Sequence, residues 1–239
     1  MGLINPIISL DIETLNMDMK KEKLKFDDPK GWKTSVVCIH DNIKDKNYIY
    51  VSMENYAEVT RLCGGKIGFV YLQGRKADEQ RFVYPFNILE HHLSKWLGDG
   101  YTILTHNGLG FDLPIISKSI IDGGVGCEAI LKTWPKMQMV DTCHVLTEAT
   151  GVRYRLNHLI HSMLGIDESK LMDAANAPKE WAKGNYEEVI RYCIDDTQKT
   201  LQVYFKAGEL TGFSAIGKDD YRFVSSIEFV QTWMKWAQT

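Results

Sequence analysis

The chain has 239 residues, 44% of them hydrophobic and 25% charged, a balance typical of a soluble globular protein that can bury a sizeable core. Lys plus Arg total 28 and Asp plus Glu total 31, so the net charge of −3 is compatible with nucleic-acid binding but does not indicate it. Five cysteines without a C-x-x-C pair argue against a zinc site or a disulfide framework. The absence of a signal-peptide pattern or a long apolar run predicts a cytoplasmic protein outside the membrane.

The first part of the sequence is dominated by strand patterns. Runs of β-branched and aromatic residues with partial alternation predict strands at residues 7–12, 35–39, 48–51 and 69–72. The apolar period then changes to that of a helix over residues 89–98, which ends at a glycine.

The second part interleaves strands with helices. Further strands are predicted at residues 101–105 and 137–140, and helices from residue 113, over 156–164 and over 186–205. This order predicts an α/β fold with a mixed central sheet of about five strands flanked by helices. We assign residues 1–210 to one domain. Residues 211–239 form a C-terminal extension whose aromatic residues pack on the domain or on a protein partner.

Residues 20–33 form a basic segment, in which six lysines against three acids give a local charge of +3 and Phe26 and Trp32 are interleaved. Lysines with aromatic side chains suit a single-stranded nucleic acid, because they attract phosphates and stack on bases. A solvated loop with no binding role explains the same composition equally well, so both interpretations stay open.

Asp11 and Glu13 stand at the end of the first predicted strand, in the sequence LDIET. Residues two apart in a strand point to one face, so the two carboxylates repel each other unless a cation lies between them. A hard divalent ion with oxygen ligands meets this requirement. The Asp-x-Glu pattern is short enough to occur by chance, and a solvated strand end would need no metal.

Asp112 follows the predicted strand 101–105, after a turn that contains Gly108 and Gly110. The two glycines permit a tight turn and a close approach of the backbone to a ligand. Asp112 also precedes a predicted helix and could serve as its N-cap, a role that is compatible with ligand binding.

Tyr192, Asp195 and Asp196 lie in the last predicted helix, where the two aspartates compete for one role. A spacing of four places Asp196 on the face of Tyr192. The helical neighbours of Asp196 are largely apolar, whereas those of Asp195 are polar. Because burial of an unpaired charge is costly, we expect Asp196 to be a ligand and Asp195 to be a solvated surface residue.

Residues 10–14, 107–112 and 192–196 together resemble the three exonuclease motifs of the DEDD superfamily, in the tyrosine subgroup (DEDDy) that includes the proofreading domain of family B DNA polymerases. Each motif is weak alone, but the three occur in the family's order. The resemblance implies a ribonuclease H-like fold and two divalent metal ions, Mg²⁺ or Mn²⁺. It also implies that Tyr192 orients the attacking water. The implied metal ligands are Asp11, Glu13, Asp112 and Asp196.

Residues beside the motifs are candidates for substrate binding. The resemblance places the 3′-terminal nucleotide next to the first motif, so we expect contacts from Thr14 and Leu15. Asn107 and Phe111 belong to the second motif and are assigned to the substrate, although turn formation explains Asn107 equally well and core packing explains Phe111 better than base stacking does. Asp141 also stands at a strand end, where we expect a helix N-cap.

These assignments predict a 3′→5′ exonuclease that hydrolyses phosphodiester bonds from the 3′ end of a single-stranded nucleic acid, with DNA favoured over RNA. The expected partner is a nucleic acid with a free 3′ end, and we expect no association with a membrane. A non-catalytic nucleic-acid-binding module of the same fold is the alternative, and the complete set of four acids and a tyrosine argues against it. An endonuclease is a third interpretation, which the tyrosine motif disfavours.

Overall fold

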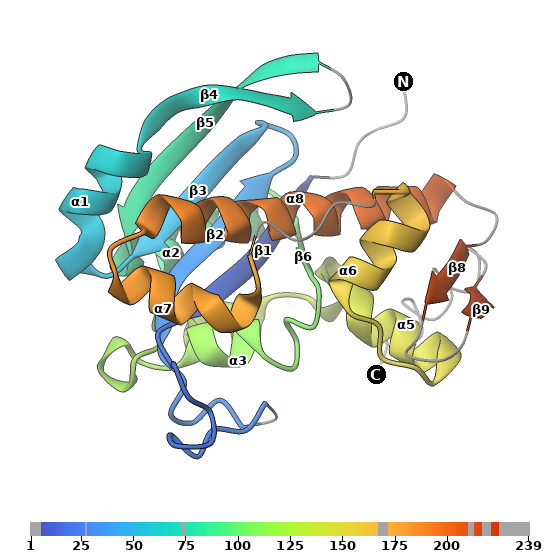
Figure 1. Cartoon of the computed structure of the whole chain (residues 1–239), viewed down its shortest axis with the longest axis horizontal. Helices are drawn as coiled ribbons and strands as arrows, with labels where there is room; N and C mark the ends of the chain where they lie inside the picture. The colour runs from blue at the N-terminus through green and yellow to red at the C-terminus, as the bar shows by residue number, and fades with distance from the viewer. Residues whose placement is uncertain are drawn as a thin grey trace.

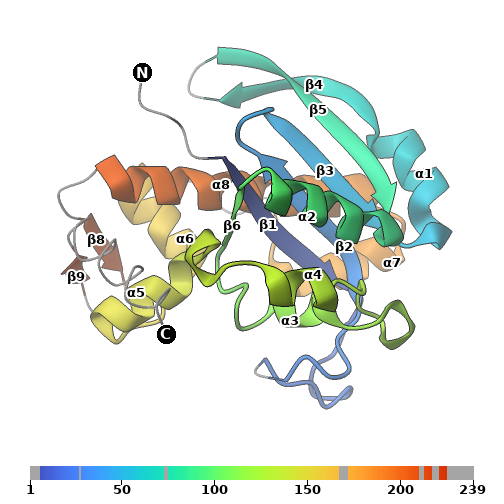
Figure 2. The ribbon, with the colours of Figure 1, turned by 180° about the vertical axis from the view of Figure 1, so that it is seen from behind.

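The computed structural model describes residues 6–26, 28–72, 75–166, 172–209, 213–216 and 221–224. In these ranges helices cover both faces of a central seven-stranded sheet (Figures 1 and 2). The strands are β1 (Ile7–Thr14), β2 (Thr34–Asp41), β3 (Lys46–Val51), β4 (Gly65–Leu72), β5 (Arg75–Pro85), β6 (Thr102–Thr105) and β7 (Met139–Asp141). The helices are α1 (Met53–Cys63), α2 (Leu89–Gly98), α3 (Asp112–Ser117), α4 (Glu128–Thr133), α5 (Thr142–Thr150), α6 (Leu156–Leu159), α7 (Ala177–Ala182) and α8 (Tyr186–Glu209).

The sheet is mixed, with the strand order β4-β5-β3-β2-β1-β6-β7. β1 pairs antiparallel with β2 and parallel with β6, and β7 continues the sheet parallel to β6. The predicted α/β fold with a mixed sheet flanked by helices is therefore confirmed, and β1 is an interior strand. The described part has seven strands in this sheet where the sequence predicted about five.

The sequence analysis predicted neither the strand β5 nor the helix α1. The first half of β5 is rich in charged residues and lacks the apolar alternation by which strands are recognised. Pairing with β4 on one side and β3 on the other nevertheless holds it in the sheet. The charged half pairs with β4 and the second half with β3, so pairing with neighbouring strands overrides a weak local preference for a strand.

Alternation along β1 decides which side chains meet which helices. The apolar residues at even positions from Ile8 to Ile12 join the core cluster that includes residues of α2 and α3. The odd positions face α8, because the Ser9 hydroxyl donates a hydrogen bond to the carbonyl of Thr197 at 2.8 Å. Asp11 and Glu13 share the parity of Ser9, so β1 presents both carboxylates to the face that α8 covers.

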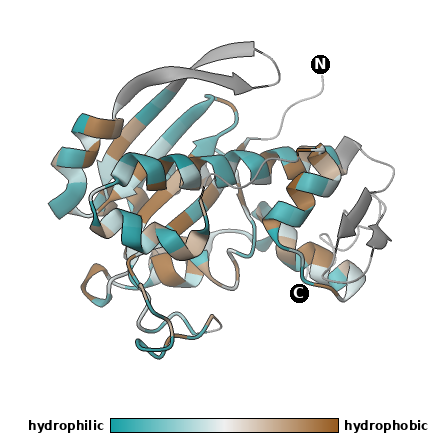
Figure 3. Ribbon diagram, in the orientation of Figure 1, coloured by the Kyte–Doolittle hydropathy of each residue, from teal (hydrophilic) through white to brown (hydrophobic). Residues whose placement is uncertain are grey.

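α8 is a helix of 24 residues that lies across β1 and β2. Figure 3 shows mainly hydrophilic residues along its outward side, while Val189, Ile190 and Cys193 are fully buried on its inner side. This one-sided pattern is that of a helix packed on a sheet. No helix in the described ranges combines the length and the apolar character needed to cross a membrane.

Beyond α8 the described residues include a small antiparallel pair, β8 (Phe213–Ile216) and β9 (Tyr221–Val224). β8 lies beside α6 and the π-helical turn Ile160–Leu164 that follows it. Most of the proposed extension 211–239, including Trp233 and Trp236, falls outside the described residues, so the domain boundary at residue 210 stays a prediction.

Candidate active site

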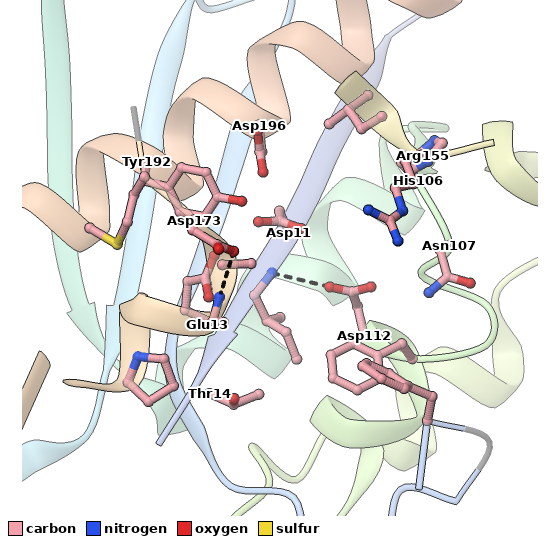
Figure 4. Close-up of a pocket in the computed structure, with 18 of the residues that line it drawn as sticks. Asp11, Glu13, Thr14, His106, Asn107, Asp112, Arg155, Asp173, Tyr192 and Asp196 are labelled. Carbon is pink, nitrogen blue, oxygen red and sulfur yellow. Dashed lines mark hydrogen bonds between the residues drawn. The ribbon is translucent and has the colours of Figure 1, made fainter. Parts of the chain in front are cut away.

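An open pocket lies where β1, α3 and α8 meet, and all three sequence motifs contribute to its wall (Figure 4). The five residues predicted to be catalytic line it together, and we call it the acid pocket. These residues are Asp11, Glu13, Asp112, Tyr192 and Asp196. The structure thus brings together side chains that are up to 185 positions apart in the sequence (196 − 11).

Asp11 lies at the centre of the carboxylates. Burial raises the pKa of its carboxyl well above the usual value, and the negative charges of Asp112, Asp196 and Glu13 raise it further. The Cys193 thiol, which donates to the backbone carbonyl of Asp11 at 3.6 Å, ties α8 to β1 at this point. The four acids are therefore close enough to oppose one another's ionisation, as expected for carboxylates that share a site.

Asp112 is the first residue of α3, whose N-cap position is taken by Phe111 without a side-chain hydrogen bond. The N-cap role that we considered for Asp112 is therefore wrong. Its Oδ1 instead accepts a hydrogen bond from the backbone N–H of Ile12 at 3.2 Å. Burial, followed by the charges of Asp141 and Asp196, raises the pKa of Asp112 to about 7.

Asp141 organises the turn before Asp112. It caps α5 by accepting from the N–H groups of Cys143 and His144 at 3.0 and 3.1 Å, so the predicted N-cap is confirmed. The same carboxylate accepts from the N–H groups of Asn107 at 2.8 Å and Leu109 at 2.9 Å. Four backbone donors satisfy this buried acid, which explains why it belongs to the scaffold of the site.

The two glycines of the turn differ in their surroundings. A Cβ atom at Gly108 would lie 2.5 Å from Cβ of Thr105, a buried residue of β6, so this position admits no side chain. At Gly110 the nearest atom would be Asn107 Oδ1 at 3.5 Å, an ordinary contact. Asn107 itself has a φ of 69°, in the left-handed region that asparagine tolerates better than most residues. The turn therefore depends on Gly108 and Asn107 but not on Gly110.

α8 separates the two aspartates as its periodicity predicts. Asp196 is buried and lines the acid pocket beside Tyr192, and Asp195 does not line it. Asp195 is partly buried and forms an ion pair with Lys199 at 2.6 Å, so its surroundings are less solvated than the sequence suggested. Burial and the charges of Asp196, Glu13 and Asp11 raise the pKa of Tyr192 well above its usual value. The Tyr192 hydroxyl therefore stays protonated at neutral pH.

The residues assigned to the substrate are only partly gathered at the site. Thr14, Asn107 and Phe111 line the acid pocket, whereas Leu15 does not. Leu15 has an exposed side chain, and its backbone N–H donates to the carbonyl of Lys33 at 2.8 Å. Its place in the structure therefore gives no support to the substrate contact that we expected.

The basic segment borders the acid pocket through its aromatic side chains. The rings of Phe26, Trp32 and Phe111 form a cluster, with centroids 5.7 Å apart for the two pairs that include Phe26 and 4.8 Å apart for Trp32 and Phe111. Trp32 is buried, so Phe26, which is 57% exposed, is the ring available to a ligand. None of the six lysines of the segment lines the pocket.

Hydrogen bonds within the segment 16–33 give it a defined shape. Glu22 accepts from the side chain of Asn16 at 2.6 Å and from the N–H of Met17 at 2.9 Å. Asn16 also accepts from the N–H of Lys33 at 2.7 Å and donates to the carbonyl of Gly31 at 3.1 Å. These bonds join residues of the segment to one another and give it a defined local structure, and whether the segment binds a substrate stays a prediction.

Three charged residues of the pocket wall escaped the sequence analysis, namely Arg153, Arg155 and Asp173. The two arginines alternate around Tyr154 in the sequence VRYRL, and this alternation was the available signal. Asp173 accepts from the N–H of Ala175 at 3.2 Å and begins a short 3₁₀ turn.

The donor set of the acid pocket suits hard divalent cations. The four carboxylates supply only oxygen ligands. Burial, followed by the negative charges of neighbouring carboxylates, raises the pKa of Asp11 and of Asp112, and a bound cation would favour the ionised form of both. Within the described residues, no three His, Cys, Asp or Glu side chains already converge as a closed metal site. The residues therefore fit Mg²⁺ or Mn²⁺ by chemistry and by charge.

Comparison with known proteins gives the family. A model of the RNase_H superfamily matches residues 62–207, more than half of the chain. The matched stretch includes Asp112, Tyr192 and Asp196 and begins after Asp11 and Glu13. No significant match is found among curated proteins. The mixed sheet flanked by helices agrees with this match, and the chain belongs to the RNase_H superfamily.

Proposed function

We propose that the protein is a metal-dependent 3′→5′ exonuclease of the DEDDy kind, which removes nucleotides from the 3′ end of a single strand and favours DNA over RNA. Membership of the RNase_H superfamily indicates a nuclease in general. The observation that carries the finer proposal is the convergence of Asp11, Glu13, Asp112 and Asp196 with Tyr192 in the acid pocket.

The carboxylates suit the binding of cations rather than proton transfer to the substrate. A phosphodiester is negatively charged, so four acids repel it unless cations lie between them. Asp11, Glu13, Asp112 and Asp196 would hold the two ions, Mg²⁺ or Mn²⁺, which supply activation of water and neutralisation of the leaving oxygen. Asp112 is already oriented by its hydrogen bond from Ile12.

Tyr192 suits the positioning of water. Because burial and three carboxylates raise its pKa, its hydroxyl keeps the proton and can donate or accept a hydrogen bond without acting as a base. It reaches the pocket from α8, one helical turn before Asp196, so the packing of one helix on β1 orients both residues.

The preference for a single strand rests on the aromatic side of the pocket. Phe26 is exposed, and its ring packs against Trp32 and Phe111, both of which line the pocket. Every base of a single strand can present a face to such a ring, whereas the bases inside a duplex are already stacked on their neighbours. A terminal nucleotide of a single strand would therefore lie between this ring and the carboxylates.

Degradation of 5′-end-labelled DNA and RNA 20-mers in Mg²⁺ or Mn²⁺ tests the proposal. We expect a ladder that shortens from the 3′ end, release of mononucleotides, and inhibition by a chelator or by a 3′-phosphate. Asp11→Asn serves as the inactive control. Circular single strands cut as fast as linear ones would identify an endonuclease. Binding without cleavage in either metal would identify a non-catalytic module.

A further inference from the structure

Two arginines that the proposed chemistry leaves unused lie on the wall of the acid pocket. Arg153 and Arg155 belong to the segment 152–155 between α5 and α6, which has no helical structure, and both are exposed. Tyr154, between them, is buried. Because side chains alternate along an extended backbone, burial of Tyr154 turns both guanidinium groups toward the opposite, open side.

Contacts with the second motif fix this segment. The Arg153 Nη2 donates to Asn107 Oδ1 at 2.7 Å, and His106 Nε2 donates to the carbonyl of Tyr154 at 3.1 Å. The other ring nitrogen of His106 lies 2.8 Å from the Thr142 hydroxyl. Figure 4 shows His106, Asn107 and Arg155 together on one side of the carboxylates, with Tyr192 on the other. The arginines are therefore held at a set place relative to Asp112.

No acidic side chain in the described residues pairs with either arginine. The Arg153 guanidinium bonds to the neutral amide of Asn107 and to the Cys143 thiol, and within the described residues the Arg155 guanidinium has neither a hydrogen bond nor an ion pair. Five carboxylates line the same pocket, yet within the described part of the chain none of them pairs with either arginine. Exposed guanidinium groups beside an acidic site, with most of their N–H donors unused, suit an anion that comes from outside.

We propose that Arg153 and Arg155 form a phosphate-binding site for the substrate strand, at the phosphate next to the scissile one on its 5′ side. This inference rests on the proposed exonuclease function. When one nucleotide is removed at a time from a 3′ end, every phosphate other than the scissile one lies on the 5′ side. The planar fork of an arginine matches two phosphate oxygens, and two arginines in alternation can share one phosphate.

Such a site offsets the repulsion between the acid pocket and the strand. The carboxylates hold cations and face the scissile phosphate, while the arginines attract a phosphate that does not react. Interactions with a part of the substrate that does not change act equally on the bound substrate and on the transition state. Removal of the arginines should therefore raise KM and leave kcat nearly unchanged.

The test compares the double variant Arg153→Ala/Arg155→Ala with the wild-type protein on a single-stranded DNA 12-mer. We expect KM to rise at least about tenfold, since hydrogen bonds to charged groups are the stronger ones, and kcat to stay within about twofold. The slope of binding against salt should fall by about 0.7 for each phosphate that the variant no longer binds. Arg153→Lys, which keeps the charge but removes the fork, should lie between. Arg61→Ala on α1 removes an exposed arginine outside the pocket and should change nothing.

Neutral methylphosphonate linkages identify the phosphate. We expect one substituted position, adjacent to the scissile linkage, to raise KM in the wild-type protein and to have no further effect in the double variant, because both changes remove the same interaction. An equal effect of that substitution in both proteins, or an unchanged KM in the double variant, would overturn the phosphate site.

Binding of the fluorescein-labelled 12-mer in Ca²⁺, measured by anisotropy, separates this inference from the proposed function. If the wild-type protein binds the strand but never degrades it, and the double variant binds at least about tenfold more weakly, the arginine site stands and the exonuclease proposal fails. If degradation proceeds with equal binding by both proteins, the exonuclease proposal stands and the arginine site fails.

Discussion

The carboxylate of Asp112 accepts a hydrogen bond from the backbone N–H of Ile12 at 3.2 Å, across 100 positions of sequence. β6 pairs with β1 only as far as Ser9, so the N–H of Ile12 lies beyond the end of the neighbouring strand. An acid of the pocket thus satisfies a backbone donor that a longer β6 would have paired. Since Ile12 stands between Asp11 and Glu13, this bond fixes the second motif against the first.

The raised pKa of Asp112 makes the stability of the metal-free protein depend on pH. A carboxyl in the unfolded chain titrates near 4, whereas that of Asp112 titrates at about 7 in the folded protein. Between these values the folded state retains a proton that the unfolded state loses, so the free energy of unfolding falls as pH rises through this window. Asp112→Asn keeps an acceptor for Ile12 and removes the titration. We expect the free energy of unfolding of Asp112→Asn to vary less with pH than that of the wild-type protein. Urea denaturation in the presence of a chelator, from pH 4.5 to 7.5, measures this.

Asp99→Asn, which replaces an exposed acid outside the pocket, is the matched control for this measurement and should keep the wild-type slope. Addition of Mg²⁺ at pH 7.5 should raise the free energy of unfolding of the wild-type protein more than that of Asp112→Asn, because cations bound to the acids stabilise only the folded state. Identical slopes for the wild-type protein and Asp112→Asn would show that Asp112 ionises freely.

Asp195 and Asp196 provide a matched pair on one helix. Asp196→Asn removes a charge from the acid pocket and should lower the initial rate by more than about a hundredfold, since even indirect support of a metal site contributes 10–100-fold. Asp195→Asn should keep activity within about threefold and reduce stability by up to about 1 kcal/mol, because it breaks the pair with Lys199.

Tyr192→Phe keeps the ring and removes the hydroxyl, so its rate should fall between those of the two aspartate variants. Initial rates on a single strand, together with thermal unfolding of each variant, give the order directly. An inactive Asp195→Asn together with an active Asp196→Asn would show that Asp195, and not Asp196, is the functional aspartate of α8.

Gly108 and Gly110 differ in the room available for a methyl group. Gly108→Ala would bring Cβ within 2.5 Å of the buried Thr105, so the turn must shift, at a cost of about 1–3 kcal/mol of stability. The shift would also move Asp112 and reduce activity. Gly110→Ala meets an ordinary contact and should stay within about 1 kcal/mol of the wild-type stability. Urea denaturation and initial rates check both, and equal effects of the two variants would contradict the distinction.

Phe26→Ala should weaken binding of a single strand with little change in folding. Its ring is 57% exposed on the aromatic cluster, and stacking of one base contributes about 1–3 kcal/mol. Binding of a blunt duplex should be affected less, because only its terminal base pairs have a free face. Anisotropy with both ligands measures the difference. Ile121→Ala, at an exposed apolar side chain outside the pocket, should alter neither affinity. An equal loss for both ligands would remove Phe26 from base recognition.

Local periodicity was enough to place the acids on their elements. Alternation in β1 predicted that Asp11 and Glu13 share a face, and the helical period of α8 separated Asp196 from Asp195. The N-cap by Asp141 was predicted for the same reason, since capping involves only neighbouring residues. These features depend on backbone geometry within one element, which the order of residues determines directly.

Features that depend on a second element were not predictable in this way. The strand character of β5 comes from pairing with β3 and β4, against a sequence whose first half is charged. Asp112 had the sequence context of an N-cap, and only the end of β6 beside β1 gave it the N–H of Ile12 to bind.

The sequence by itself determined the type of the elements that carry the four carboxylates and the tyrosine, and the face of its element that each of these side chains occupies. Only the tertiary structure decided that Arg153 and Arg155 join them, because they lie in a connection without helical periodicity and reach the site through contacts with Asn107 and His106. The physical reason is distance. A local pattern reports which face of one element a residue occupies, whereas the meeting of faces depends on packing among elements far apart in the chain.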